Sequence, residues 1–255
     1  MRVFRSLVFT AAFYTTTALM LVGYLPLLLL PRRFTMRALR SHAEWCLWLL
    51  RVIVGTRLEV RGRANIPVGS ALVAAKHQSA WETFALIPLL SDPAIVMKAE
   101  LGWIPLYGWY AIKFKHILIA RERGPAALRK MIADAKARAG ESRQIVIFPE
   151  GTRQAVGAGP SYKSGVAALY EGLDLPCVPV ALNSGVFWPR RSLMRYPGTI
   201  VVEFLEPIPP GLDRGSFREM LQTRIETATA RLVEETQTRP KSYGTRPTNT
   251  LAEQK

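Results

Sequence analysis

The chain has 255 residues, 49% of them hydrophobic and 21% charged, which is enough apolar material for one large domain with a packed core. Its formal net charge of +15 favours a polyanionic neighbour such as an anionic membrane, nucleic acid or a phosphorylated substrate. The two cysteines are far apart and cannot form the disulfide framework of a small secreted domain. The three histidines show no H-x-x-x-H or H-E-x-x-H spacing, so the sequence predicts no metal site.

An uncharged stretch of 26 residues, 6–31, dominates the N-terminus. As a helix it would be ~39 Å long, whereas a bilayer core is about 30 Å thick. A secretory signal peptide is the competing interpretation, because Arg2 and Arg5 precede the apolar run. No small-x-small cleavage site follows the run, so we expect a retained membrane segment.

A second apolar stretch, 43–55, follows closely and carries Trp45 and Trp48, residues typical of the headgroup level. Four arginines lie between the two stretches, at positions 32, 33, 37 and 40. A helical hairpin within one leaflet and a single span both fit this pattern. In either case the positive-inside tendency predicts that the Arg-rich side faces the cytoplasm. We expect an inner or plasma membrane location, with the catalytic domain on the cytoplasmic side.

Short apolar runs alternate with amphipathic stretches over residues 56–237. We expect strands at 71–75, 94–98, 116–121, 144–148, 177–183 and 199–208, and helices at 81–90, 125–140, 163–172 and 216–237. The last of these helices carries Arg and Glu along its solvent face. Such alternation predicts an α/β domain with a mixed, largely parallel sheet covered by helices. Residues 1–55 form the membrane-associating segment, and residues 238–255, with little apolar content, are expected to be a disordered tail.

The stretch KHQSAWETF, 76–84, carries chemistry just past the end of an expected strand. Ser79 and Glu82 form an S-x-x-E pattern, which is typical of a capping box at a helix start. The same placement would let the Glu82 carboxylate accept a proton from one nitrogen of His77. The other nitrogen could then take a proton from a substrate hydroxyl. The two roles are compatible.

A second stretch, IVIFPEGTR at 145–153, ends a buried strand in a turn. Pro149 ends the ladder of strand hydrogen bonds, and Gly151 permits a tight turn. Glu150 and Arg153 then follow with opposite charges. They form either a surface ion pair of little energetic value or an arginine held in place to bind a phosphate bidentately.

Together these stretches resemble the glycerolipid acyltransferases, specifically the 1-acyl-glycerol-3-phosphate acyltransferases, which are marked by H-x-x-x-x-D and F-P-E-G-T-R motifs. The second motif is intact at 148–153, and the first has Glu82 in place of Asp. Segments 96–110, 119–124 and 177–184 resemble further family motifs, in the family's order, and the resemblance covers about 58–210. Lys76 also departs from the Asn often found before the histidine, and would either keep the imidazole neutral or bind an anionic group.

The resemblance implies a glycerophosphate-acyltransferase-like fold and transfer of an acyl chain from acyl-CoA or acyl carrier protein, without other cofactors, to the 2-hydroxyl of 1-acyl-glycerol-3-phosphate. The product would be phosphatidic acid. His77 would be the general base and Glu82 its orienting partner. The substrate-binding residues implied are Lys98, Arg121, Glu150, Gly151, Thr152 and Arg153. The net charge fits these anionic substrates and an anionic membrane surface.

Other functions remain to be weighed. An acyltransferase acting on another lyso-lipid, such as lyso-ornithine lipid, would carry similar motifs, and an inactive membrane-anchored scaffold would follow if Glu82 disables the base. A serine hydrolase would need a G-x-S-x-G motif, which is absent. A nucleic-acid-binding module would not explain the apolar N-terminus, so no nucleic-acid partner is expected. The aromatic stretch 102–114 would contact the interface or acyl chain, or form a core helix.

Overall fold

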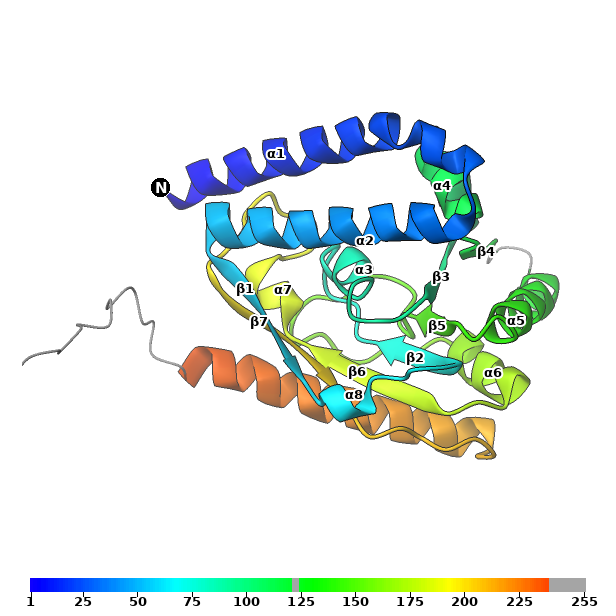
Figure 1. Ribbon diagram of the computed structural model, residues 1–255. Coiled ribbons are helices and arrows are strands. Elements are labelled where there is room, and N and C mark those ends of the chain that lie inside the picture. Colours follow the sequence, from blue (N-terminus) through cyan, green and yellow to red (C-terminus); the bar gives the residue numbers. More distant parts are fainter. Residues whose placement is uncertain (121–123, 239–255) are drawn as a thin grey trace, which may run out of the picture.

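The computed structural model describes residues 1–120 and 124–238. In these residues a seven-stranded sheet forms the centre of the molecule, with helices on both sides (Figure 1). The strand order is β1-β7-β6-β2-β5-β3-β4, and only the β6–β7 pair is antiparallel. The predicted α/β class with a mixed, largely parallel sheet is therefore confirmed. The strands are β1 Thr56–Arg61, β2 Ala71–Ala75, β3 Pro93–Lys98, β4 Ile117–Ile119, β5 Gln144–Ile147, β6 Cys177–Leu182 and β7 Gly198–Phe204.

The helices divide between the two faces of the sheet (Figure 1). One face is covered by the N-terminal hairpin of α1 and α2 together with three short helices, and the other by three longer ones. The helices are α1 Arg2–Gly23, α2 Arg32–Leu49, α3 Glu82–Ala85, α4 Tyr107–Lys113, α5 Gly124–Ala139, α6 Ser164–Leu173, α7 Ser184–Phe187 and α8 Arg214–Thr238. Helix α2 continues into a π-helical turn, Leu50–Val54, before β1 begins.

The alternation of side chains along a strand places the central strand β2 in both cores. Val73 and Ala75 pack toward α1, α2 and α3, whereas Leu72 and Ala74 pack toward α5, α6 and α8. All five residues of β2 are buried, as expected for a strand in the middle of a covered parallel sheet. The continuous apolar run at 71–75 is explained by this burial on both faces.

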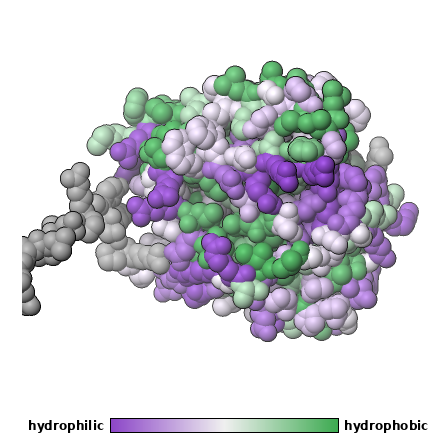
Figure 2. Space-filling view, viewed as in Figure 1, coloured by the Kyte–Doolittle hydropathy of each residue, from purple (hydrophilic) through white to green (hydrophobic). Residues whose placement is uncertain are grey.

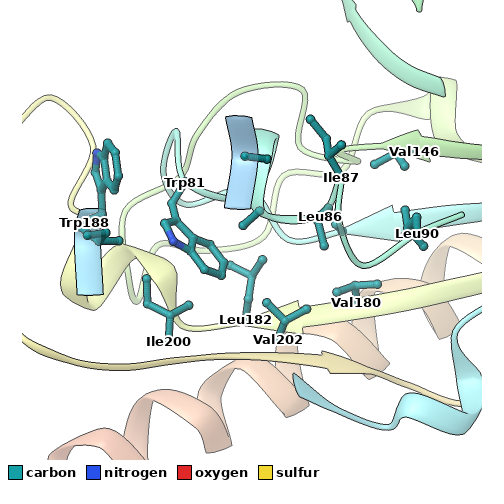
Figure 3. Close-up of a cluster of buried hydrophobic side chains, with 14 of the residues drawn as sticks. Trp81, Leu86, Ile87, Leu90, Val146, Val180, Leu182, Trp188, Ile200 and Val202 are labelled. Atoms are coloured by element: carbon teal, nitrogen blue, oxygen red, sulfur yellow. The ribbon is translucent and has the colours of Figure 1, made fainter. Parts of the chain in front are cut away.

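The predicted helix at 81–90 is only partly correct. The α-helix covers Glu82–Ala85 and gives way to turns closed by bonds from the Ile87 N–H to the Phe84 carbonyl and from the Leu89 N–H to the Leu86 carbonyl. Pro88 has no N–H and its ring disfavours helix in the residues before it, so the helix stops early. The segment is nevertheless firmly packed, with Trp81 reaching toward β6 and β7 in the core of Figure 3.

Strand β1 was not predicted, because its sequence TRLEVR alternates apolar and charged residues and only Thr56 is buried. It pairs in parallel with β7 at the edge of the sheet. The expected strand at 116–121 is shorter, ending at Ile119. The predicted tail at 238–255 lies outside the described residues except for Thr238.

Helix α1 runs alongside α2 and is the one described helix that is long and apolar enough to cross a membrane (Figure 1). It is tied to the domain near both ends: the Ser6 hydroxyl accepts from the Arg195 N–H at 2.9 Å, and the Tyr110 hydroxyl donates to the Leu21 carbonyl at 2.9 Å. Phe9 is fully buried and packs edge-on against Trp188. One side of α1 therefore belongs to the protein core.

The opposite side of α1 is apolar and exposed. Figure 2 shows hydrophobic residues along this upper edge of the molecule, over α1 and α4, with a hydrophilic band beneath them. The exposed apolar side chains of α1 are Val3, Phe4, Leu7, Val8, Tyr14, Leu19 and Val22. Those near and on α4 are Trp103, Ile104, Tyr107, Trp109 and Ile112. The aromatic stretch 102–114 thus contributes to both the surface and the core, where Tyr110 and Ala111 are buried.

Candidate active site

The backbone of His77 is fixed on both sides as the chain leaves the sheet. The N–H of Lys76 makes the last bond of β2 to β6, with the Val180 carbonyl at 2.9 Å. The N–H of His77 then donates to Oε2 of Glu150 at 2.7 Å, and its carbonyl accepts from the N–H of Gln154 at 2.8 Å. Both partners lie in the loop after β5, so this loop sets the position of His77.

The imidazole of His77 is also held from two directions. Its Nδ1 lies 2.9 Å from Oε1 of Glu82, and its ring stacks on Phe148 with centroids 4.3 Å apart. Glu82 is fully buried, whereas the His77 side chain is 13% exposed. A carboxylate at Nδ1 favours a proton on that nitrogen, which leaves Nε2 as the acceptor. The predicted contact between the two motif residues is present.

The carboxylate of Glu82 accepts from several more donors. Oε1 receives the N–H groups of Gln78 at 2.6 Å and Ser79 at 2.7 Å. Oε2 receives the hydroxyls of Ser79 at 3.0 Å and Ser184 at 2.8 Å. Donors on both oxygens hold the carboxylate in one fixed orientation. Glu is therefore well accommodated where Asp is more usual.

The capping box predicted for Ser79 and Glu82 is half correct. Glu82 does reach back to the N–H of Ser79. The hydroxyl of Ser79, however, accepts from the N–H of Trp81 at 2.8 Å and donates to Glu82, and the helix begins at Glu82 rather than at Trp81, where the expected helix 81–90 starts. The N–H and the hydroxyl of Ser79 therefore hold the Glu82 carboxylate in place, rather than forming a full capping box at the helix start.

Sequence reasoning missed Ser184. It stands at the start of α7, directly after β6, and is fully buried. Its neighbour Gly185 donates its N–H to Oε1 of Gln78 at 3.0 Å, so two contacts tie α7 to the loop that carries His77. In the sequence, Ser184 is only the last residue of segment 177–184, which resembles a family motif, and that resemblance does not indicate which residue Ser184 contacts.

The turn after β5 forms as predicted, but the charges are arranged differently. Gly151 has a φ of +67° and its N–H closes a turn onto the Phe148 carbonyl at 2.9 Å. Glu150 is fully buried and pairs with Lys76 at 2.6 Å instead of holding Arg153. The expected Glu150–Arg153 pair is therefore wrong, because the carboxylate turns inward and Arg153 points to the surface.

Lys76 does not take the anion-binding role that was one of the two expected for it. Its side chain is 3% exposed and its ammonium is paired with Glu150 and Glu226. It is therefore not free to receive an anion. Burial raises the pKa of Glu150 above its ordinary value, and the Lys76 ammonium opposes that rise.

A cavity of about 810 Å³ opens in front of His77. Apolar residues of α1, α2, α3 and α4 form much of its wall, including Phe13, Leu21, Leu39, Phe84 and Ala111. Of the predicted site residues, those that line it are His77, Lys98, Gly151, Thr152 and Arg153. Glu82 and Glu150 are not among the lining residues, and Glu150 acts on the site through its hydrogen bond with the His77 N–H. Arg121 lies outside the described residues.

The charged side chains that line this cavity in the described part of the chain are all positive. Among the described residues that line it, Lys98, Arg153 and Lys163 are cationic and none is acidic. All three are exposed on the surface. Within residues 1–120 and 124–238, no group of three or more His, Cys, Asp or Glu side chains could hold a metal ion. The arrangement combines a base, an apolar chamber and cations for an anionic group.

Comparisons with known proteins agree with this arrangement. A family model described as Acyltransferase matches residues 57–183. The chain is 39% identical over 162 residues to a 1-acyl-sn-glycerol-3-phosphate acyltransferase of Pseudomonas aeruginosa. The aligned region covers 62% of this chain and 63% of that protein. It is 28% identical over 162 residues to a protein of the same name from Cocos nucifera, covering 63% of this chain and 52% of that one. The chain thus spans less than two thirds of the length of these curated relatives.

The fold has a solved counterpart. The crystal structure of the 1-acyl-sn-glycerophosphate (LPA) acyltransferase PlsC from Thermotoga maritima superposes with a TM-score of 0.75 at 23% sequence identity. The match covers 94% of this chain and 100% of that one. It extends beyond residues 57–183 and shows that the overall architecture is shared.

Proposed function

This chain belongs to the acyltransferase family, and from that premise we propose that it transfers a fatty acyl chain from a thioester donor to the 2-hydroxyl of 1-acyl-glycerol-3-phosphate. The product is phosphatidic acid and the released group is a thiol. The observation that carries the proposal is the His77–Glu82 pair, which stands at the wall of an apolar cavity with cations on its lining. An acyl chain suits the apolar wall, and a phosphomonoester suits the cations.

In the proposed mechanism, Nε2 of His77 removes the proton of the acceptor hydroxyl. The resulting alkoxide attacks the thioester carbonyl, and a new C–O bond forms. When the tetrahedral intermediate collapses, the C–S bond breaks and the departing thiolate receives the proton from Nε2. Glu82 holds Nδ1 and stabilises the imidazolium between these two transfers. General-base catalysis of this kind contributes about 10²–10⁴-fold to the rate.

The acceptor phosphate binds at the exposed cations. Arg153 is the favoured contact, because a guanidinium can bind a phosphate with two parallel hydrogen bonds. Its backbone carbonyl accepts from the Arg190 guanidinium at 2.6 Å, which anchors the loop without occupying the Arg153 side chain. Lys98 and Lys163 contribute charge from the other sides of the cavity. The donor, acyl-CoA or acyl carrier protein, is also anionic and is drawn by the same field.

The substrate is a membrane lipid, and the protein associates with the membrane through its exposed apolar face. Because α1 is bonded to the domain at Ser6 and at Leu21, we place it lying in the interface of one leaflet rather than crossing the bilayer. The arginine-rich start of α2 then meets anionic headgroups on the cytoplasmic side. Trp109→Ser should lower binding to anionic vesicles. Val68→Ser, which removes another exposed apolar side chain but from the loop before β2, should not.

The experiment that tests this function is an acceptor panel with purified protein, run once with palmitoyl-CoA and once with palmitoyl-acyl carrier protein as the donor. The acceptors are 1-acyl-glycerol-3-phosphate, 1-acyl-glycerophosphocholine and lyso-ornithine lipid. We expect transfer to the first at a kcat/KM at least about tenfold above the others, the effect of one well-placed charged contact. Preference for lyso-ornithine lipid would retain the reaction and overturn the headgroup. Failure with every acceptor and both donors would favour the inactive scaffold.

A further inference from the structure

Behind the candidate active site lies a network of charged side chains that the reaction does not use directly, with Lys76 and Glu150 buried and Glu226 25% exposed. The ammonium of Lys76 donates to both carboxylate oxygens of Glu226, at 2.7 and 2.9 Å. It also lies 2.6 Å from Oε1 of Glu150, as an ion pair that is poorly aligned for a hydrogen bond. The hydroxyl of Tyr162 donates to Oε1 of Glu226 at 3.0 Å. None of these four side chains lines the cavity.

Glu226 comes from helix α8, which carries none of the motif residues. The sequence indicated Arg and Glu along the solvent face of α8, and Glu226, 25% exposed, lies at the border of that face and turns toward Lys76. Phe217, Leu221 and Ile225 of the same helix are fully buried against β6 and α6, which fixes α8 under the sheet. The carboxylate of Glu226 is therefore delivered to Lys76 by a rigid element 150 residues away in the sequence.

The network reaches His77 through one bond. Glu150 gives Oε1 to Lys76 and Oε2 to the N–H of His77. A lone Lys76–Glu150 pair would let the ammonium bridge both oxygens of Glu150 and compete with the His77 N–H for Oε2. Two hydrogen bonds to Glu226 draw the ammonium to the far side, so that Oε2 stays with His77.

A role in stability alone explains the network poorly. Burying the charges of Lys76 and Glu150 is costly, and well-packed apolar residues in place of a buried ion pair are often as stable or more so. The charges do orient one another: Glu226 orients the Lys76 ammonium, and Lys76 orients the Glu150 carboxylate. Small displacements of a catalytic group are expensive, at about 10²-fold in rate for 1 Å.

We propose that Glu226 is a positioning residue for His77, acting through Lys76 and Glu150, so that helix α8 belongs to the framework of the active site. This inference rests on the proposed function, because it assigns Glu226 a part in the same reaction. It adds a residue that lies outside every motif of the sequence.

The kinetic test uses Glu226→Gln, with Glu219→Gln as the matched control on the exposed side of the same helix. We expect Glu226→Gln to lower kcat about tenfold while KM for acceptor and donor changes less than about twofold. Glu226→Asp should recover part of the loss. In a double-mutant cycle with Lys76→Met, the losses should be non-additive. Unchanged kcat in Glu226→Gln, or additive losses, would overturn the inference.

A second measurement needs no substrate and separates this inference from the proposed function. Hydrogen–deuterium exchange at the His77 N–H reports its bond to Glu150. Exchange there should be about tenfold faster in Glu226→Gln than in wild type or Glu219→Gln, with the strands of the sheet unchanged. If wild type transfers no acyl group but this exchange still rises, the proposed function fails and the linkage stands. If the exchange is unchanged, the linkage itself fails.

Discussion

The hydroxyl of Ser184 donates a hydrogen bond of 2.8 Å to Oε2 of Glu82, across 102 residues of sequence. It joins the strand–helix junction after β6 to the one after β2. Because these two strands are neighbours in the parallel part of the sheet, their carboxyl ends meet at the same edge. The sheet topology therefore completes the shell of donors around the Glu82 carboxylate.

Ser184→Ala should lower kcat about tenfold and leave KM for both substrates nearly unchanged, because a buried charge loses one donor while the cavity wall stays intact. Steady-state kinetics of the purified variant would check this. Ser70→Ala is the matched control, since it removes a hydroxyl bond to the Ala139 carbonyl at the opposite end of β2. Equal kcat values in the two variants would contradict the assignment.

Glu82→Asp should also lower kcat, by about tenfold, even though Asp is the usual residue at this position of the motif. The shorter side chain withdraws the carboxylate by about one bond length, ~1.5 Å. It cannot then keep both Ser184 and Nδ1 of His77 as partners in this surrounding. Measured kcat at or above wild type would show that the shell adapts to either acid.

Most strands were predictable because burial on both faces leaves a continuous apolar run, as in β2 and β5. The edge strand β1 was not predicted, because its charged residues interrupt the apolar run. The His77–Glu82 contact was predictable because five positions and a helix start bring the two side chains together. The partners Ser184 and Glu226 were not, since only the fold places residues 102 and 150 positions away beside them.

The error at Glu150 has a similar origin. In sequence it stands three residues from Arg153, and opposite charges at that spacing indicate a pair. The turn at Gly151 instead sends the two side chains in different directions, and the buried ammonium of Lys76 takes the carboxylate. The spacing of Glu150 and Arg153 in the sequence did not show the directions in which the turn sends their side chains.

Arg153→Ala should raise KM for 1-acyl-glycerol-3-phosphate about tenfold or more and change kcat little, because the guanidinium binds the phosphate in ground state and transition state alike. Acceptor titrations at saturating donor would measure this. Arg218→Ala, a loss of the same charge on the exposed side of α8, serves as the control. A drop in kcat at constant KM would place Arg153 elsewhere in the mechanism.

His116, which is among the residues lining the cavity, predicts a pH dependence of stability. Burial lowers the pKa of His116 from 6.5 to about 3, and Arg143 adds to this while Asp92 opposes it. Between those values the unfolded chain binds more protons, so this group's contribution to stability is present above pH 6.5 and is lost as the pH falls toward 3. From pH 7 to pH 5 the loss is about 2 kcal/mol.

Urea unfolding in detergent at these two pH values would measure that loss. His116→Asn keeps an acceptor for the Ile95 N–H, which donates to Nδ1 at 3.2 Å, but cannot titrate. The variant should therefore lose less free energy of unfolding than wild type between pH 7 and pH 5. An identical loss in both proteins would mean that His116 does not carry the effect.

The central claim is that His77 is the base and Glu82 its charged partner. Its most direct test is acyl transfer from acyl-CoA to 1-acyl-glycerol-3-phosphate by purified wild type, His77→Ala and Glu82→Gln, with folding checked by circular dichroism. Gln keeps an oxygen for Nδ1 of His77 but no charge, so we expect a folded protein with kcat reduced about 10²-fold, and no detectable transfer by His77→Ala. Transfer by His77→Ala at the wild-type rate would contradict the account.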